Sequence, residues 1–383
     1  MSEIDAARQA AVRADVTRAR TLVVKVGSAL LSSPGRGLAK DLVEALGEEI
    51  SRLADGGRRV LLVSSGAVAE GMARLGLARR PDRIHELQAA AAVGQMGLVQ
   101  AYERAFARYG RHAAVVLLTH EDMADRQRYL NARSTLTTLL NFGVVPVINE
   151  NDSVATDEIR FGDNDTLAAM TTNLLQAEAL ILLTDIQGLY ERDPRADPGA
   201  PIVGFADVAD PRLDGMVGSS GALGRGGMIT KLKAARLAAR SGAHTVIAGG
   251  ADPGVLSRIM AGEAEGTLLA AGVSPLDARK RWIVGQQRAR GKVLLDAGAV
   301  SALVARGVSL LPVGVTGVEG EFSRGSLVQC VGPDGRVVAQ GLSNYSSGET
   351  RKMLGAGTHE IVARLGYSLE PELIHRDNLV LLA

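Results

Sequence analysis

The sequence predicts an α/β protein with a mostly parallel open sheet sandwiched by helices, followed by a small β-rich domain. Short, nearly all-apolar runs alternate with longer Ala- and Leu-rich stretches along the first part of the chain, as is typical of parallel sheets covered on both faces. After about Pro275 the composition changes to short β-like runs separated by glycine turns. We therefore expect a first domain at 1–275, a linker at 276–289, a β-rich domain at 290–369 and a C-terminal tail at 370–383.

The positions of the expected elements follow from the spacing of apolar residues. The apolar runs predict strands at 22–26, 60–64, 113–118, 144–148, 180–183 and 245–248. Helical periodicity predicts helices at 40–53, 86–108, 129–140, 166–175 and 231–239. Ligands bind at the carboxyl ends of the strands in an open α/β sheet, so we expect the chemistry in the loops that follow these strands.

Composition and charge narrow the class of protein. The chain has 383 residues, of which 46% are hydrophobic and 22% charged, as in ordinary globular domains. A net charge of +1 argues against a protein that coats nucleic acid or a membrane surface. The single cysteine, Cys330, excludes an internal disulfide and is expected to be buried in apolar surroundings. The N-terminal segment lacks the apolar core of a signal peptide and no apolar run reaches the ~20 residues of a membrane span, so we expect a cytoplasmic protein.

The most polar segment of the chain, NENDSVATDEIRFGDND, runs from Asn149 to Asp165 directly after the apolar run 144–148. Buried carboxylates are costly unless they are paired, so we interpret this segment as a site for a charged ligand. A solvated acidic loop is the alternative interpretation. Asp165 precedes the helical run 166–175, and we expect it to be the N-cap of that helix, where it could orient cations.

Three loops after predicted strands carry residues suited to anion binding. Lys25 lies within the apolar run VVKVGSALL and needs a partner if it is buried, while Gly27-Ser28 permits a phosphate to approach the backbone. A structural ion pair is the alternative role for this lysine. Ser64-Ser65-Gly66-Ala67 opens a helix, whose backbone N–H groups could bind an anion. Thr184-Asp185 ends the fifth strand and is consistent either with a nucleotide pocket or with a capped loop.

A fourth loop, GRGGMITK at 224–231, is a glycine-rich turn that leads into a helix. Glycines let the backbone surround phosphates, and Lys231 at the helix start supplies positive charge. The motif lacks the residue order of a P-loop. Two lysines, two glycine turns and an acidic cluster together indicate phosphoryl transfer without a P-loop.

Taken in order, six segments resemble the amino-acid kinase family and, within it, the glutamate 5-kinases: VVKVGS, VSSGAVAEG, ELQAAAAVGQMGLVQAYE, NENDSVATDEIRFGDND, LLTDIQGLY and GRGGMITK. The segment from GKVLLDAGAV to GLSNYSSGETRKMLG resembles the PUA domain that many of these kinases carry. The resemblance covers nearly the whole chain. It implies the amino-acid kinase fold and ATP-dependent phosphorylation of the γ-carboxylate of L-glutamate to L-glutamyl 5-phosphate, the first step of proline biosynthesis.

The resemblance also implies roles for individual residues. Lys25 and Lys231 would contact the transferring phosphoryl group and ADP, and Asp165 would hold the two lysines in register. Residues from two loops would bind glutamate: Ser65, Gly66, Asn149, Asp152 and Asn164. A larger set would contact ATP: Lys25, Thr184, Asp185, Arg225, Gly226, Gly227, Met228, Ile229, Thr230 and Lys231. Family members commonly have Thr where Arg225 stands, which puts a hydroxyl contact in doubt. Mg²⁺ is implied by ATP chemistry, although no protein ligand set is evident and phosphates and water could hold the ion.

Two alternative functions belong to other classes. One is a related kinase that forms an acyl phosphate on aspartate or N-acetylglutamate. The other is an RNA-binding protein, because PUA-like domains occur in such proteins. The segment from Arg290 to Leu365, however, contains eight Lys and Arg residues and six Asp and Glu residues. This small excess of positive charge does not support RNA binding. The resemblance further suggests feedback inhibition by proline, and we expect a homo-oligomer.

Overall fold

The structure is a computed structural model that describes residues 3–33, 37–154, 164–217, 227–272 and 289–382. The chain divides into two compact units, and each is described by itself. The first is made mainly of Met1–Met123 and Ala132–Leu276, and the second mainly of Asp277–Ala383. The expected linker at 276–289 falls almost entirely outside the described residues.

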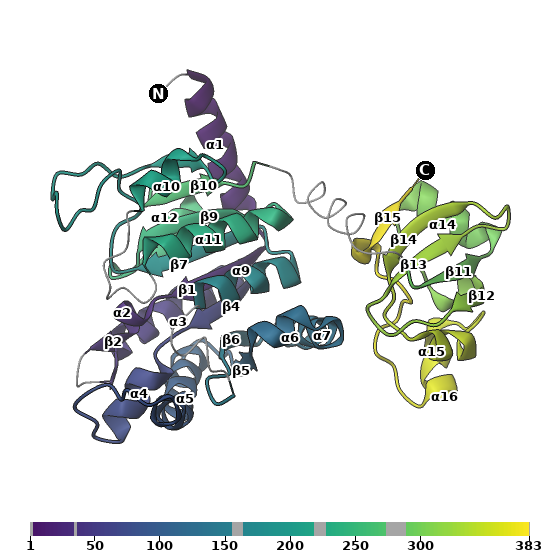
Figure 1. Ribbon diagram of the computed structural model, residues 1–383, viewed down its shortest axis with the longest axis horizontal. Helices are drawn as coiled ribbons and strands as arrows, with labels where there is room; N and C mark the ends of the chain where they lie inside the picture. The colour runs from purple at the N-terminus through teal and green to yellow at the C-terminus, as the bar shows by residue number, and fades with distance from the viewer. Residues whose placement is uncertain (1–2, 34–36, 155–163, 218–226, 273–288, 383) are drawn as a thin grey trace. The chain divides into compact units, whose positions relative to one another are not determined.

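The first unit is built on an eight-stranded sheet with the strand order β5-β6-β4-β1-β7-β9-β10-β8 (Figure 1). All neighbouring strands are parallel except β9 and β10, which are antiparallel. The strands are β1 (Thr21–Val26), β4 (Arg59–Ser64), β5 (Ala113–Leu118), β6 (Val145–Glu150), β7 (Ala179–Thr184), β8 (Phe205–Asp207), β9 (His244–Gly249) and β10 (Thr267–Ala270). A separate two-stranded sheet pairs β2 (Ser32–Ser33) with β3 (Gly37–Leu38).

Helices cover both faces of this sheet, so the prediction of a mostly parallel sheet between helices is confirmed (Figure 1). The longer helices are α1 (Glu3–Arg18), α3 (Lys40–Asp55), α5 (Ile84–Ala107), α7 (Arg126–Asn141), α9 (Asn164–Leu175) and α11 (Met228–Ala238). The shorter ones are α2 (Ser28–Leu31), α4 (Ala67–Arg74), α6 (His120–Ala124), α10 (Arg212–Met216) and α12 (Val255–Ala261). Helices α3 and α5 pack together, as do α9 and α11.

The predicted strands and helices of the first unit all form, and their ends differ from the expected ones by at most three residues. Strand β5 has the expected ends, whereas β6 continues through Asn149 to Glu150. The sequence analysis did not predict α1, β8 or β10. Strands β8 and β10 have only three and four residues, so each carries too little periodicity to be recognised.

Strand β1 lies in the middle of the sheet between β4 and β7, and its side chains alternate between two faces. Leu22, Val24 and Val26 pack into the core formed with apolar residues of α3, α5 and α12. Lys25 therefore points to the opposite face, toward α9 and α11. The placement of this lysine follows from the period of two in a strand.

The second unit contains a five-stranded sheet in the order β12-β11-β13-β14-β15, which confirms the predicted β-rich domain. Its strands are β11 (Gly291–Leu295), β12 (Val315–Gly320), β13 (Leu327–Val331), β14 (Val337–Leu342) and β15 (Leu379–Leu381). Its helices are α14 (Ala297–Arg306), α15 (Ser347–Lys352) and α16 (Ile361–Leu365). Cys330 of β13 is fully buried in the core, as expected, and burial raises the pKa of its thiol to about 12.

The segment 370–383, expected as a tail, contributes structure to the second unit. Strand β15 pairs with β14 in antiparallel register. Leu373 and Ile374 are fully buried in the core of this unit, and both form backbone hydrogen bonds with Leu310. These residues were too few and too close to the chain end to show a periodic pattern, so the sequence did not assign them to the sheet.

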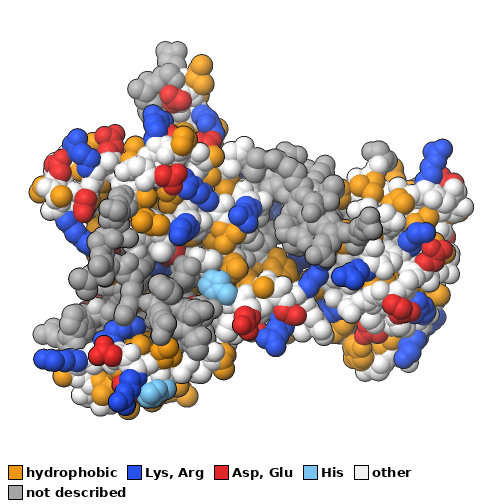
Figure 2. Space-filling view, viewed as in Figure 1, with side chains coloured by type: hydrophobic (Ala, Val, Ile, Leu, Met, Phe, Trp, Pro, Cys, Tyr) orange, Lys and Arg blue, Asp and Glu red, His pale blue; other side chains and the backbone are white. Residues whose placement is uncertain are grey.

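The distribution of surface charge concerns binding to RNA, and the length of the helices concerns insertion into a membrane. On the face shown in Figure 2, Lys and Arg side chains are interspersed with Asp and Glu over the described residues of both units. On this face, the mixture of charges of both signs does not form the strongly basic stripe that RNA-binding surfaces have. Within the part of the chain that the structure describes, no helix is both long and apolar enough to cross a membrane.

The buried position of Ile374 makes a prediction about the second unit. We expect Ile374→Ala to lower the free energy of unfolding by about 2–5 kcal/mol, because it leaves a cavity in a close-packed core. Leu382→Ala is the matched control, since Leu382 is 41% exposed, and should change stability by less than about 0.5 kcal/mol. Urea unfolding of both variants measures the difference, and an effect of Ile374→Ala as small as that of the control would show that the burial of Ile374 does not stabilise the unit.

Candidate functional site

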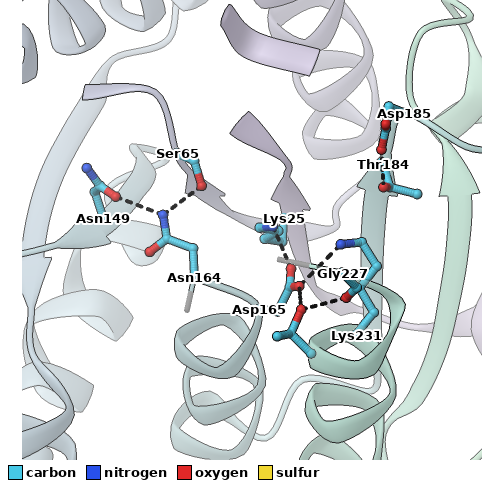
Figure 3. A network of polar contacts seen from close by, with 10 residues as sticks. Lys25, Ser65, Asn149, Asn164, Asp165, Thr184, Asp185, Gly227 and Lys231 are labelled. Atoms are coloured by element: carbon cyan, nitrogen blue, oxygen red, sulfur yellow. Dashed lines mark hydrogen bonds and ion pairs between the residues drawn. The ribbon is translucent and has the colours of Figure 1, made fainter. Parts of the chain in front are cut away.

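Polar residues meet at the carboxyl ends of four neighbouring parallel strands, which lie in the order β6-β4-β1-β7. Lys25 is near the end of β1, Ser65 follows β4, Asn149 is near the end of β6 and Thr184 ends β7 (Figure 3). Segments that are far apart in the sequence are thus brought together at one edge of the sheet. This is the position at which open α/β sheets bind their ligands.

Two lysines and one aspartate form a buried charged cluster at this edge (Figure 3). The Nζ atom of Lys25 lies 2.5 Å from Oδ1 of Asp165. The Nζ atom of Lys231 lies 3.3 Å from Oδ2 of the same carboxylate. Lys25 is 5% exposed, Lys231 4% and Asp165 1%. The structure therefore brings together the three residues that the sequence analysis assigned to catalysis.

The expectation that Asp165 caps helix α9 is wrong. The helix begins at Asn164, so Asp165 lies within its first turn. Its side chain contacts residues on other elements instead, since Oδ2 also accepts a hydrogen bond of 2.7 Å from the hydroxyl of Thr230. Asp165 can still orient cations, but it does so by ion pairs across the α9–α11 contact.

Burial and the ion pairs have opposite effects on the ionisation of Asp165. Burial alone would raise the pKa of this carboxyl group, but Lys25 and Lys231 outweigh burial and hold the pKa below its ordinary value. The pKa of Lys231 is lowered, mainly by burial and further by the neighbouring charge of Lys25, although Asp165 opposes the shift. With both lysines charged, the cluster has one excess positive charge in a poorly solvated position. Such a cluster can stabilise an anion.

A second cluster, of amides and a hydroxyl, lies beside the charged one. Asn164 donates from Nδ2 to Ser65 Oγ at 2.8 Å and to Asn149 Oδ1 at 3.0 Å. Asn149 in turn donates from Nδ2 to Oε1 of Gln95, at 2.9 Å. Ser65, Asn149 and Asn164, which the sequence analysis assigned to substrate binding, are thus joined in one hydrogen-bonded chain, called the amide cluster below (Figure 3). Because Asn164 and Asp165 are adjacent on α9, this helix belongs to both clusters.

The turn between β4 and α4 presents Ser65 to the site. Gly66 at the helix N-cap has a φ of 110°, a conformation that residues with a Cβ atom rarely adopt. The preceding residue, Ser64, forms a buried hydrogen bond of 2.9 Å between its hydroxyl and that of Tyr102 on α5. Burial raises the pKa of Tyr102, so this phenol remains protonated. The hydrogen bond between Ser64 and Tyr102 therefore connects this turn to helix α5.

The expected nucleotide contacts lie next to the charged cluster. The hydroxyl of Thr184 donates to Oδ1 of Asp185 at 3.0 Å at the end of β7. Gly227 precedes α11, and the Thr230 hydroxyl that donates to Asp165 also lies 2.7 Å from the carbonyl oxygen of Gly227. Met228 and Ile229 belong to the same helical turn. Arg225 and Gly226 lie outside the described residues. The ATP contacts predicted for them, and the effect of Arg225 where family members commonly have Thr, therefore stay predictions.

The acidic segment is described only at its two ends. Asp152 lies in the turn after β6 and is partly buried, whereas residues 155–163 lie outside the described range. Sequence reasoning missed Gln95 and Tyr102, which lie seven residues apart on α5: Gln95 contacts Asn149, and Tyr102 contacts Ser64, the residue before Ser65. No local sequence pattern identifies either residue, because both contacts depend on which elements lie beside α5 in the folded protein.

The donor set fits an ATP phosphate chain better than a metal ion bound by protein alone. Two buried lysines and the first turn of α11 offer positive charge and N–H groups to phosphate oxygens. Among the described residues, no group of three or more His, Cys, Asp or Glu side chains is placed to hold a metal ion.

Comparison with known proteins identifies the family to which the chain belongs. Residues 20–249 match the amino acid kinase family, and residues 291–365 match the PUA domain. The chain therefore belongs to the amino acid kinase family.

Curated relatives named glutamate 5-kinase align over nearly the full chain. The relative from Pseudomonas syringae pv. tomato is 58% identical and covers 97% of this chain and 100% of its own length. The relative from Thioalkalivibrio sulfidiphilus is 60% identical over 97% of this chain and 99% of its own length. The relative from Chromohalobacter salexigens is 58% identical over the whole of both chains. The resemblance predicted from the sequence motifs is thereby confirmed.

The charged cluster makes a prediction about stability. Asp165→Asn leaves two lysines buried without a counter-charge and should lower the free energy of unfolding by about 3–5 kcal/mol at neutral pH. Because the pKa of Asp165 is lowered in the folded protein, this stabilisation is present above the ordinary value of 3.8. It should be lost as the pH falls through the folded pKa.

The matched control for Asp165→Asn is Asp214→Asn, which removes a carboxylate from a surface ion pair with Arg236. This control should leave the denaturation midpoint nearly unchanged. Chemical denaturation between pH 3 and pH 8 would compare the two variants. A midpoint for Asp165→Asn equal to that of the control would contradict a central role for the carboxylate.

Proposed function

We propose that this protein is an enzyme that transfers the γ-phosphoryl group of ATP to the γ-carboxylate of L-glutamate. The products are L-glutamyl 5-phosphate and ADP, and the reaction is the first step of proline biosynthesis. The observation that carries the proposal is the buried cluster of Lys25, Asp165 and Lys231 at the carboxyl edge of the sheet. The relatives named glutamate 5-kinase support glutamate as the acceptor.

The main barrier in this reaction is electrostatic. The γ-carboxylate of glutamate is ionised at neutral pH, so it needs no general base to become a nucleophile. Its oxygen forms a bond to the γ-phosphorus while the bond from that phosphorus to the bridging oxygen of ADP breaks. Two anions must approach each other, and Lys25 and Lys231 would offset that repulsion by contacting the transferring phosphoryl group. Asp165 would position both ammonium groups without contacting the phosphate.

The amide cluster would bind the amino acid. Ser65, Asn149 and Asn164 offer hydroxyl and amide groups, and the Gly66 turn offers backbone N–H groups at the start of α4. Asp152, in the turn after β6, would attract the α-ammonium group. In this arrangement the γ-carboxylate extends toward the charged cluster, because Asn164 and Asp165 are consecutive residues.

ATP would lie on the opposite side of the charged cluster. Thr184, Asp185 and the first turn of α11 from Gly227 onward would contact it, which is supported by their position beside the charged cluster. The family resemblance assigns Arg225 and Gly226 to the same nucleotide. We propose Mg²⁺ as the accompanying ion, held mainly by phosphate oxygens and water. Such an ion would supply further neutralisation of the phosphate charges.

Regulation and assembly extend the proposal. Proline shares the α-carboxylate of glutamate and a charged nitrogen beside it, so feedback inhibition by proline would most simply arise from competition at the amide cluster. We also propose that the enzyme is a cytoplasmic homo-oligomer.

A substrate panel tests the acceptor. ADP release should be followed with glutamate, aspartate, N-acetylglutamate and UMP at equal concentrations, with ATP and Mg²⁺ in excess. We expect glutamate alone to support turnover: aspartate is one methylene too short to span the distance from the amide cluster to the lysines, and N-acetylglutamate lacks the α-ammonium group. Faster turnover with aspartate or N-acetylglutamate would assign the enzyme to another acceptor of the same class.

The roles of the two lysines make a kinetic prediction. We expect Lys25→Ala and Lys231→Ala each to lower kcat on the order of 10²-fold or more, with a smaller change in the KM for glutamate, because the charge matters most in the transition state. Lys233→Ala is the matched control, since Lys233 lies on the same helix and is exposed. Near-normal kcat in either lysine variant would remove that residue from the catalytic assignment.

A further inference from the structure

The hydrogen-bonded chain through the amide cluster begins on a residue outside the proposed site. It joins Gln95 on α5, Asn149 on β6, Asn164 on α9 and Ser65 in the turn after β4, by bonds of 2.9, 3.0 and 2.8 Å. Asn149 is 2% exposed and Asn164 is 7% exposed. Because an amide has a donor end and an acceptor end, a chain of this kind has a direction.

The direction of the chain decides which groups remain for a substrate. Asn149 donates to Gln95, so its carbonyl oxygen is the end that accepts from Asn164. Asn164 then uses Nδ2 for both Asn149 and Ser65. The hydroxyl oxygen of Ser65 therefore acts as an acceptor within the chain, and its hydrogen is directed elsewhere. Asn164 Oδ1 is buried and accepts no hydrogen bond within the described residues.

These remaining groups are one donor and one acceptor placed side by side. The hydrogen of Ser65 suits a carboxylate oxygen, and Oδ1 of Asn164 suits an ammonium group. Together they match the two charged groups of an α-amino acid. If every amide in the chain were reversed, Asn164 would present an NH₂ group and Ser65 a lone pair, so the positions for the carboxylate and the ammonium group would be exchanged.

We propose that Gln95 is a positioning residue that sets this direction, and so decides which of the two groups meets the carboxylate of the amino acid and which meets its ammonium group. Its Oε1 atom accepts from Asn149 and holds that amide in one of its two orientations. Gln95 acts through Asn149 and Asn164, and it is placed at the far end of the chain from Ser65. This inference rests on the proposed function, because it assigns the substrate groups that meet the amide cluster.

The test replaces Gln95 by a side chain of similar length that accepts no strong hydrogen bond. In Gln95→Met the amide of Asn149 loses its fixed partner, and we expect the KM for glutamate to rise about 10-fold or more. The KM for ATP should stay within about twofold, since the chain does not reach the nucleotide residues. Gln100→Met is the matched control, because Gln100 is exposed on the same helix, and it should leave both constants unchanged.

Combining Gln95→Met with Ser65→Ala distinguishes a positioning role of Gln95 from a general effect on folding. If Gln95 acts through the chain, Gln95→Met should raise the KM for glutamate much less in a Ser65→Ala background than in the wild type. Equal effects in both backgrounds would overturn the proposal. Gln95→Asn is a second variant in case Gln95→Met does not fold: its amide is withdrawn by one methylene and should give the same rise in KM.

Two further outcomes are distinguishable. A wild-type protein that binds ATP but does not phosphorylate glutamate would contradict the proposed function itself. A wild type that is active on glutamate, with Gln95→Met and Gln95→Asn both folded and unchanged in the KM for glutamate, would contradict only the role of Gln95.

Discussion

The ion pairs of one buried carboxylate with two buried lysines are the interaction on which the site depends. Lys25 belongs to the central strand of the sheet, Lys231 to α11, and Asp165 to the first turn of α9. Two ammonium groups buried side by side would repel each other and lose their hydration, so they need a shared counter-charge. Asp165 supplies it, and in doing so fixes the relative positions of a strand and two helices.

The same interaction leaves the cluster with one excess positive charge. This excess charge attracts an anion more strongly in a buried position than it would in water, because little solvent screens it. A phosphoryl group approached by a carboxylate is a suitable ligand for it. The amide cluster beside it is uncharged and can therefore bind the acceptor without competing with Asp165 for the lysines.

Much of this architecture could be predicted from sequence, and the reason is local. The strand at 113–118 and the helix from Lys40 are recognisable because period and apolar length are properties of a short window. Strands β8, β10 and β15 were missed because they are too short to show a period. Helix α1 was missed because most of its apolar residues are alanines, which give a weak periodic pattern, and only a few larger apolar residues such as the buried Val12 and Val16 mark its inner face.

The site was predicted less completely than the fold. The motifs identified Lys25, Asp165 and Lys231, but the role of Asp165 as a helix cap was wrong because its partners come from other elements. Gln95 was missed because its contact with Asn149 depends on how α5 packs against the end of β6, and no local pattern reports that packing. The direction of a hydrogen-bonded chain is likewise a property of the assembled fold.

A crystal structure with glutamate and a non-hydrolysable ATP analogue would test the central claim most directly. Both Nζ atoms, of Lys25 and of Lys231, should lie about 2.7–3.2 Å from oxygens of the terminal phosphoryl group, while each remains paired with Asp165. The γ-carboxylate of glutamate should face that phosphorus from the side of the amide cluster. A terminal phosphoryl group bound away from both lysines, with the pairs to Asp165 intact, would show that the charged cluster is structural and does not act on the transferring group.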